Sequence, residues 1–259
     1  MPTSQTDPVD SSPILEATDI QAGYGQMLIV RDTSVRVNAG SLVAIIGPNG
    51  SGKSTLLKTL AGELTPRGGR IKFASRDVTG MRQDRLARLG VAYVRQEKEL
   101  FPSLSVHDNL RLGGYILRKK QVEPAIEQVF VRFPILAARS KTMAGNLSGG
   151  ERKMLSIGRV LMTSPRLVLL DEPSAGLSPI ASAQLLNEHV PSLTQDGTAV
   201  LIVEQRALQV LKHADWAYVM GAGTVLRSGR GLDLLQSDSL VATLLGQSQT
   251  DGTGGAQLS

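Results

Sequence analysis

The segment GPNGSGKS at residues 47–54 constrains the fold more than any other part of the chain. It follows the apolar run SLVAII at 41–46 and precedes KSTLLKTLAG at 53–62, in which leucines recur at helical spacing. A glycine-rich loop between a buried strand and a helix lets backbone amides converge on an anion at the positive end of the helix dipole. In such a loop Lys53 reaches the β and γ phosphates of a nucleotide, and Ser54 binds Mg²⁺. The segment therefore predicts a phosphate-binding loop within an α/β fold.

Apolar strands and helices alternate along most of the remaining chain. We expect strands at 14–20, 32–37, 41–46, 70–74, 91–94, 166–171, 198–203 and 215–220, a turn at 23–25, a loop at 95–104, a mainly helical insert at about 105–165, and helices at 53–62, after Ser178 and at 205–213. Ser178 is suited to cap its helix, with Pro179 in the first turn. This order predicts an α/β protein with a mainly parallel sheet, helices on both faces and an antiparallel β portion near the N-terminus.

The composition excludes several other classes of protein. The 259 residues include no cysteine and only 3 histidines, which disfavours a disulfide framework and metal centres built from these residues. The net charge is +5, but basic residues are dispersed and aromatic residues make up only 3%, so we expect no nucleic-acid partner. No apolar run approaches the roughly 18 residues of a membrane span, and the N-terminal residues do not resemble a secretory signal. Residues 1–13 and 247–259 are rich in Ser, Thr, Gly, Gln and Pro, which predicts disordered tails.

Two adjacent acidic residues follow the apolar strand expected at 166–171. In LVLLDEP, Asp171 and Glu172 would lie at the carboxyl edge of the sheet, where open α/β sheets bind ligands. Asp171 can support a Mg²⁺ ion, while Glu172 can polarise a water that attacks a γ-phosphate. Acidic residues after a strand also serve as helix caps. Beside a phosphate-binding loop, the catalytic interpretation is favoured.

The segment NLSGGERKM at 146–154 allows two interpretations. Ser148 and Glu151 have the spacing of a capping box, in which each side chain accepts a hydrogen bond from a backbone amide at the helix start. A cap does not explain the adjacent Gly149 and Gly150, whose bare backbone would allow an anion to approach the helix N-terminus. The residues alone leave both interpretations open.

Taken in order, GPNGSGKS, Gln96 after VAYV, LSGGE at 147–151 and LLDEP at 169–173 resemble the ATP-binding subunit of ABC transporters. The resemblance covers about residues 14–246. It implies a P-loop NTPase fold of the ABC type with a helical subdomain at about 105–165, and it implies ATP and Mg as cofactors. In that family two ATPase subunits stack head to tail, so that the LSGG segment of one closes over the nucleotide held by the other.

The resemblance also implies individual roles for the matching residues. ATP would contact Tyr24, Gly47, Pro48, Asn49, Gly50, Ser51, Gly52, Lys53, Ser54 and Thr55 of one subunit and Ser148, Gly149 and Gly150 of the other. Mg²⁺ would be held by Ser54, Gln96 and Asp171, and the catalytic residues would be Glu172, Gln96 and Gln205. Tyr24 matches the aromatic residue that stacks on adenine. Gln96 matches the glutamine that contacts the attacking water and senses the membrane subunit.

Finer features resemble one branch of the family. Residues 151–179 are similar to the second ATPase of branched-chain amino acid importers and to the related ATPase of urea importers, and VEQ at 203–205 supports the same branch. Most members have a histidine at the position of Gln205, whose neutral amide donates a hydrogen bond but supplies no imidazolium charge. The chain also departs from the common pattern at Arg95, Arg152, Lys153 and Ser178. None of the three histidines is a convincing substitute for the missing one.

The resemblance implies an ATPase that powers uptake of a small polar solute, with branched-chain amino acids favoured. It would lie peripherally on the cytoplasmic face of the inner (plasma) membrane. Its partners would be a second ABC ATPase subunit, identical or paralogous, two membrane-spanning permease subunits and, indirectly, a solute-binding protein. The alternatives are a urea or amide importer ATPase and a weakly hydrolysing regulatory nucleotide-binding subunit. An ABC ATPase outside transport is disfavoured because no binding domain is appended.

Overall fold

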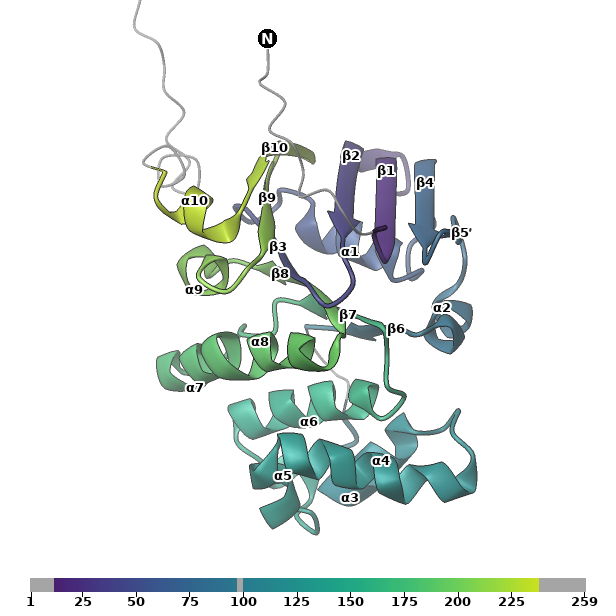
Figure 1. Ribbon diagram of the computed structural model, residues 1–259, viewed down its shortest axis with the longest axis vertical. Helices are drawn as coiled ribbons and strands as arrows, with labels where there is room; N and C mark the ends of the chain where they lie inside the picture. The colour runs from purple at the N-terminus through teal and green to yellow at the C-terminus, as the bar shows by residue number, and fades with distance from the viewer. Residues whose placement is uncertain (1–11, 97–99, 238–259) are drawn as a thin grey trace, which may run out of the picture.

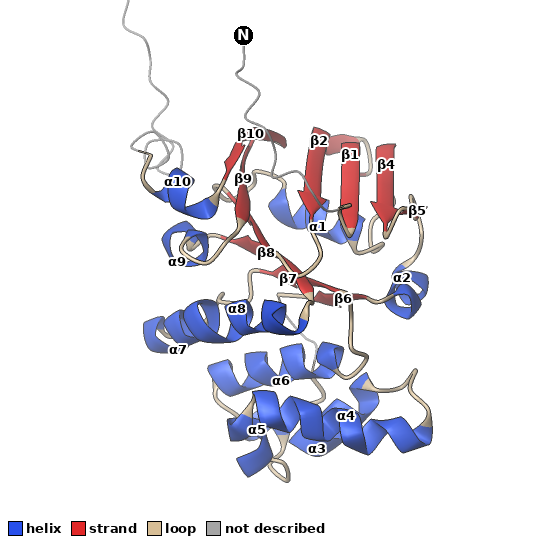
Figure 2. Ribbon diagram, viewed as in Figure 1, coloured by secondary structure: helices blue, strands red, loops and turns tan. Residues whose placement is uncertain are grey.

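The computed structural model describes residues 12–96 and 100–237. In Figure 1 an antiparallel sheet lies at the top, a second sheet crosses the middle, and helices fill the lower half. Figure 2 shows the same division, with strands concentrated above and helices below. The antiparallel sheet has the order β2-β1-β4-β5 and consists of β1 (Leu15–Tyr24), β2 (Met27–Val37), β4 (Gly68–Phe73) and β5 (Arg76–Asp77).

The second sheet has six strands in the order β10-β9-β3-β8-β7-β6. Its strands are β3 (Leu42–Ile46), β6 (Val91–Val94), β7 (Leu167–Asp171), β8 (Ala199–Glu204), β9 (Trp216–Gly221) and β10 (Thr224–Gly229). All pairings are parallel except that of β9 with the edge strand β10. The parallel strands β3, β6, β7 and β8 therefore end at one edge of the sheet, where their following loops meet.

Two hydrophobic cores cover the two faces of this sheet. Successive side chains of a strand point to opposite faces, so Val43 and Ile45 of β3 join the core formed with α1 and the antiparallel sheet, whereas Ala44 and Ile46 join the core formed with the lower helices. Every residue of β3, β7, β8 and β9 is buried, as expected for parallel strands covered on both faces.

The helices fall on either side of the six-stranded sheet. The α-helices are α1 (Lys53–Leu60), α2 (Gln83–Leu89), α3 (Val106–Gly113), α4 (Lys119–Arg132), α5 (Pro134–Ala138), α6 (Gly149–Leu161), α7 (Pro179–Gln184), α8 (Val190–Ser192), α9 (Ala207–Leu211) and α10 (Gly231–Leu235). A π-helical turn, Leu185–His189, joins α7 to α8. In Figure 1 helices α3 to α6 lie below α7 and α8, farthest from the antiparallel sheet. Within the described residues, no helix has the length and apolar character needed to cross a bilayer.

The sequence predictions match most elements, with errors at ends and short elements. The turn predicted at 23–25 is wrong at its start, because β1 continues to Tyr24 and pairs with Met27. The helix predicted at 205–213 is confined to Ala207–Leu211. Helices α2 and α10 and strands β5 and β10 were not expected. The tails predicted at 1–13 and 247–259 lie outside the described residues except for residues 12 and 13, and the domain limits 14–246 and 105–165 stay predictions.

Candidate functional site

The loop at 47–54 joins the centre of the sheet to the start of α1. Gly47 has a φ of 152°, and a Cβ there would lie 2.2 Å from the carbonyl oxygen of Met220, so only glycine fits. Gly52, the N-cap of α1, has a φ of 98°. The Lys53 ammonium donates hydrogen bonds to the carbonyls of Gly47 and Pro48, both at 2.9 Å. These two bonds tie the start of the loop to the ammonium group of Lys53 at its end.

The remaining loop residues fit an anion-binding cradle. Pro48, Asn49 and Gly50 form an exposed crest, while Ser51, Gly52 and Thr55 are buried. Within the described part of the chain, the buried Ser51 hydroxyl has no hydrogen-bond partner. A buried polar atom without a partner is costly unless another group satisfies it. A phosphate group at the N-terminus of α1 has the chemistry to do so.

The electrostatics of Lys53 favour an anionic ligand. The side chain is only 4% exposed, and this burial lowers the pKa of Lys53 below its ordinary value. Glu172, Asp171 and Glu204 oppose that effect through their negative charges. Because the charged form of a buried lysine is stabilised by nearby negative charge, a bound phosphate would favour the protonated amine further.

Asp171 lies beside the start of α1 at the end of β7. The Ser54 hydroxyl donates to Asp171 Oδ1 at 2.9 Å, and the Tyr93 hydroxyl donates to Asp171 Oδ2 at 3.1 Å. Burial raises the pKa of Asp171 and also that of Tyr93, whose phenol therefore stays a donor. Tyr93 was missed by the sequence analysis, although it is the polar residue of the otherwise apolar VAYV strand beside β7.

The neighbouring oxygen atoms of Ser54 and Asp171 are suitable ligands for a magnesium ion, which prefers hard oxygen ligands and retains several waters. Among the described residues, no group of three His, Cys, Asp or Glu side chains lies close enough to bind a metal. A magnesium ion here would take its protein ligands from this hydroxyl and carboxylate, with the rest from nucleotide and water. The structure does not join Gln96, the third expected ligand, to either residue; its amide donates instead to Glu172.

Glu172 is held in place by its backbone and by two amide side chains. Its φ of 43° is left-handed, a conformation that non-glycine residues seldom adopt, and its N–H donates to the carbonyl of Val203 at 2.9 Å. Gln205 Nε2 donates to Glu172 Oε2 at 2.8 Å, and Gln96 Nε2 approaches the same oxygen at 3.3 Å. The three residues expected to be catalytic therefore meet at one carboxylate oxygen, although they come from three separate loops.

Tyr24 lies at the end of β1 with its side chain half exposed. The carbonyl of Ile29, in the same hairpin, would be 3.4 Å from a Cβ at Gly52 and 2.0 Å from one at Gly223, so the hairpin packs against the phosphate-binding loop. Gly223 donates to the carbonyl of Ser51 at 3.1 Å and accepts from the N–H of Arg31 at 2.8 Å. Tyr24 belongs to the same hairpin, and half of its surface is exposed to solvent.

The start of α6 is built by local interactions. Ser148 Oγ accepts from the N–H of Glu151 at 3.2 Å, and Glu151 Oε2 accepts from the N–H of Ser148 at 2.7 Å, so the expected capping box is present. A Cβ at Gly149 would lie 3.3 Å from Leu177, and one at Gly150 would lie 3.3 Å from Ala181. The glycines thus also permit close packing, a reason that the sequence analysis missed. No hydrogen bond between described residues joins Ser148 to the loop at 47–54 of the same chain.

Of the two unusual residues after LSGGE, Arg152 donates to the carbonyl of Leu147, whereas Lys153 connects α6 to the loop of Gln96. Lys153 is 8% exposed and its ammonium donates to the carbonyls of Gln96 at 3.2 Å and Arg95 at 3.4 Å. The Arg95 guanidinium pairs with Glu63 at 3.2 Å. Ser178 caps α7 by accepting from the N–H of Ala181 at 3.3 Å, as its position predicted.

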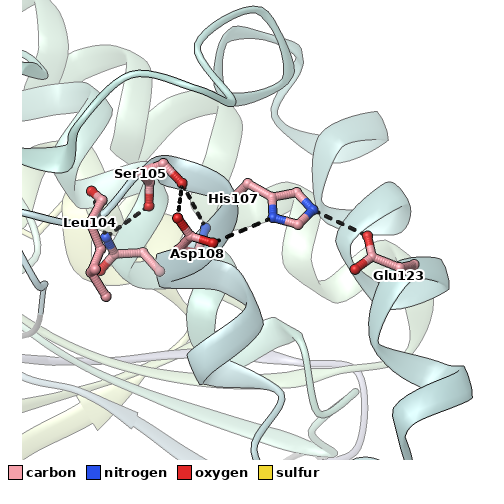
Figure 3. Close-up of polar contacts among 6 residues, drawn as sticks. Leu104, Ser105, His107, Asp108 and Glu123 are labelled. Atoms are coloured by element: carbon pink, nitrogen blue, oxygen red, sulfur yellow. Dashed lines mark hydrogen bonds and ion pairs between the residues drawn. The ribbon is translucent and has the colours of Figure 1, made fainter.

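The three histidines make other contacts. Figure 3 shows His107 on α3 between Asp108 and Glu123, with Nε2 at 3.1 Å from Glu123 Oε2 and Nδ1 at 4.0 Å from Asp108. His189 packs edge-on against Phe133 with 5.5 Å between ring centroids, and burial lowers the pKa of His189. His213 lies just beyond α9 rather than within a helix, 3.3 Å from Asn187. The structure thus gives each histidine a packing or polar partner outside the site.

Comparison with known proteins identifies the family of this fold and loop arrangement. Residues 30–175 match the family model described as ABC transporter, and the chain belongs to the ABC transporter ATP-binding family. It is an ATPase of that class, built on the P-loop NTPase fold. The ADP conformation of MJ1267, an ATP-binding cassette of an ABC transporter, aligns with a TM-score of 0.83 and 31% identity over 92% of this chain and 100% of that one.

Two curated relatives illustrate the range of similar transport systems. The high-affinity branched-chain amino acid transport ATP-binding protein BraG of Pseudomonas aeruginosa is 38% identical over 233 residues, which cover 90% of this chain and 100% of BraG. The lipopolysaccharide export system ATP-binding protein LptB of Escherichia coli is 32% identical over 236 residues, covering 90% of this chain and 97% of LptB. Similarity therefore extends to ATP-binding proteins of branched-chain amino acid transport and of lipopolysaccharide export.

Proposed function

We propose that this chain is the ATPase subunit of an importer for a small polar solute, with branched-chain amino acids as the favoured class. The observation that supports import is the 38% identity to BraG over that protein's whole length. Gln205, which occupies the position of the usual histidine, supports the same branch of the family. The proposed location is the cytoplasmic face of the inner membrane, on two membrane-spanning subunits served by a solute-binding protein.

The proposed chemistry is in-line attack of water on the γ-phosphate of ATP. The carboxylate of Glu172 accepts a hydrogen bond or a proton from the attacking water. Gln96 and Gln205 hold this carboxylate in position. Lys53 and the amides of the loop at 47–54 bind the phosphates, while the ring of Tyr24 stacks on the adenine. Ser54 and Asp171 would hold a magnesium ion, which, when bound, neutralises charge on the phosphates.

The proposed active unit is a dimer in which Ser148, Gly149 and Gly150 contact the nucleotide of the second ATPase subunit. Two observations support this role. Among the described residues, the hydrogen bonds of Ser148 are local, to Glu151 and Arg152, and the segment lies at the N-terminus of a 13-residue helix, where backbone N–H groups favour an anion. The dimer partner can be a second copy of this chain or a related ATPase.

A groove of about 370 Å³ beside Arg95 supports contact with the membrane-spanning subunits. Large apolar residues line this groove and remain exposed to solvent, with exposed fractions of 71% for Tyr115, 49% for Phe101 and 42% for Leu112. Exposed apolar groups of this size around a groove favour a protein partner. The groove is also lined by Tyr93 and Arg95, which links its surface to the strand and loop that lead to Gln96.

The experiment that tests this function is reconstitution of the chain with its own membrane subunits and solute-binding protein. We expect leucine to stimulate ATP hydrolysis, whereas a Glu172→Gln complex stays inactive. Stimulation by urea instead would indicate the amide branch. Stimulation by lipopolysaccharide alone would overturn import in favour of export, which the similarity to LptB makes the second candidate. Hydrolysis that stays very slow with every solute would favour the regulatory alternative.

A further inference from the structure

A second buried carboxylate lies behind the proposed catalytic one. Glu204 ends β8, the neighbour of the strand that delivers Asp171, and it is only 1% exposed. Glu204 Oε1 accepts from the N–H of Ser174 at 2.8 Å, and Oε2 accepts from the Ser174 hydroxyl at 2.9 Å. Oε2 also accepts from the N–H of Gln205 at 3.2 Å and, more weakly, from that of Arg206 at 3.5 Å. One carboxylate thus bonds both to the loop that follows β7 and to the loop that follows β8.

These contacts complete a ring of interactions around Glu172. Ser174 follows Glu172 by two residues, and Gln205 follows Glu204 directly. Gln205 in turn donates its side-chain amide to Glu172 at 2.8 Å. Glu204 is thus linked to Glu172 in two ways. It bonds to Ser174, which is two residues from Glu172 in the chain, and it is followed by Gln205, which bonds to Glu172. A shift of the Glu204 carboxylate would therefore move the amide that holds Glu172.

Retaining a carboxylate at this depth is energetically demanding. Burial raises the pKa of Glu204, and the hydrogen bonds from Ser174, Arg206 and Gln205 oppose that rise. A buried charge is tolerated only when such bonds satisfy it. A glutamine of the same shape cannot replace it, because an amide has one acceptor oxygen and an NH₂ group that only donates. In either orientation the NH₂ group would face at least one backbone N–H that Glu204 now accepts from.

We propose that Glu204 is a positioning residue for ATP hydrolysis, which fixes the loop of Gln205 so that its amide holds Glu172. The inference rests on the proposed roles of Glu172 and Gln205. It predicts that Glu204 acts on the rate of hydrolysis rather than on nucleotide affinity. It also predicts that Glu204 loses its influence once the side chain of Gln205 is removed.

The test is a double-mutant cycle with Glu204→Gln and Gln205→Ala in the assembled ATPase complex. We expect Glu204→Gln to lower kcat by about tenfold, the scale of one hydrogen bond to a charged group, and to leave the Kd for ATP within about twofold. In the Gln205→Ala background the same substitution should lower kcat by less than about twofold, because coupled residues are not additive. Glu127→Gln, an exposed change on α4, is the matched control.

Ser174→Ala provides a second variant should Glu204→Gln not fold. It removes one donor to Glu204 and keeps the backbone N–H, so we expect a smaller loss of kcat in the same direction. Thermal melts check that each variant is folded. An unchanged kcat, an equal loss in both backgrounds, or a change in Kd alone would overturn the role of Glu204. Full activity in Glu172→Gln would instead overturn the proposed function, so the two failures are distinguishable.

Discussion

The edge of the sheet and the start of α6 carry proposed site residues in contrasting ways. At the edge, Ser54 bonds to Asp171 and Gln205 bonds to Glu172, so residues far apart in the chain are held together. At the start of α6, the hydrogen bonds that Ser148 makes with other described residues go to Glu151 and Arg152, three and four residues further along. The first region is organised by the tertiary fold of one chain. In the second, the hydrogen bonds of Ser148 are local, and its proposed role in nucleotide binding requires contact with another molecule.

In the first region, Glu172→Gln is expected to have the largest effect on hydrolysis. The substitution keeps the shape but removes the basic carboxylate, so hydrolysis by the assembled complex should fall by about 10²–10⁴-fold, the usual contribution of a general base. Nucleotide affinity should stay within about threefold, since Lys53 and the loop at 47–54 are untouched. Single-turnover hydrolysis and ATP titration measure the two quantities. A loss of binding without a loss of chemistry would remove Glu172 from the catalytic role.

The second region is tested by Ser148→Arg. A bulky cation at the start of α6 should spare ATP binding by the isolated chain yet lower hydrolysis by the assembled complex by about 100-fold, as expected for loss of a group that stabilises transition-state charge. Ser105→Arg is the matched control, because Ser105 caps α3 in the same way, accepting from the N–H of Asp108 at 3.0 Å. Equal effects of the two substitutions on hydrolysis and stability would mean that Ser148 is a helix cap and nothing more.

Lys53→Ala tests phosphate binding in the first region, the edge of the sheet. Removing an ammonium that bonds phosphate should weaken ATP binding by roughly tenfold to a hundredfold, since hydrogen bonds to charged groups contribute about 1.5–3 kcal/mol. The fold should survive because Lys53 is the first residue of α1 and its ammonium bonds two carbonyls of the preceding loop, those of Gly47 and Pro48. Lys120→Ala, an exposed change on α4, controls for loss of one positive charge. Unchanged ATP affinity in Lys53→Ala would contradict the phosphate-binding role.

The same contrast explains how much the sequence could predict. The loop at 47–54, the pair Asp171 and Glu172, and the capping box of Ser148 are each contiguous, so spacing and residue type are sufficient to find them. Strands buried on both faces were found for the same reason, because their apolar runs are local. Gln96 and Gln205 were found only through resemblance to the family, since a glutamine in a loop carries no signal of its own.

The residues that sequence analysis missed are those whose role depends on neighbouring strands. Tyr93 reaches Asp171 because β6 lies beside β7, and Glu204 reaches Ser174 because β8 lies on the other side of β7. Strand order is set by the whole fold rather than by local pattern. The available signal was a polar residue within or at the end of an apolar strand near this edge. Helix α2 and strand β10 were missed because such short elements are stabilised mainly by tertiary packing.

The smallest expected effect concerns Glu151 and its dependence on pH. The N–H of Ser148 donates to the Glu151 carboxylate and lowers the pKa of Glu151, an effect that burial partly opposes. A carboxyl whose pKa is lower in the folded state stabilises the fold above its unfolded pKa of about 4.3, and that contribution is lost as pH falls through the folded pKa. Because Glu151→Gln keeps an acceptor but cannot ionise, it isolates the contribution of the charge.

We expect the free energy of unfolding of the native chain to exceed that of Glu151→Gln by about 0.5–1 kcal/mol near pH 7, the lower range for a helix cap. The difference should shrink toward zero as pH falls from the unfolded pKa of Glu151 through its lower folded pKa, because the protonated Glu151 is then as neutral as glutamine. Urea unfolding at a series of pH values measures it, with Glu127→Gln on α4 to report the loss of an exposed carboxylate elsewhere. A difference that stays constant with pH would mean that the carboxylate charge adds nothing to the cap. The start of α6 would then depend on hydrogen bonding alone, and its glycines on packing against Leu177 and Ala181.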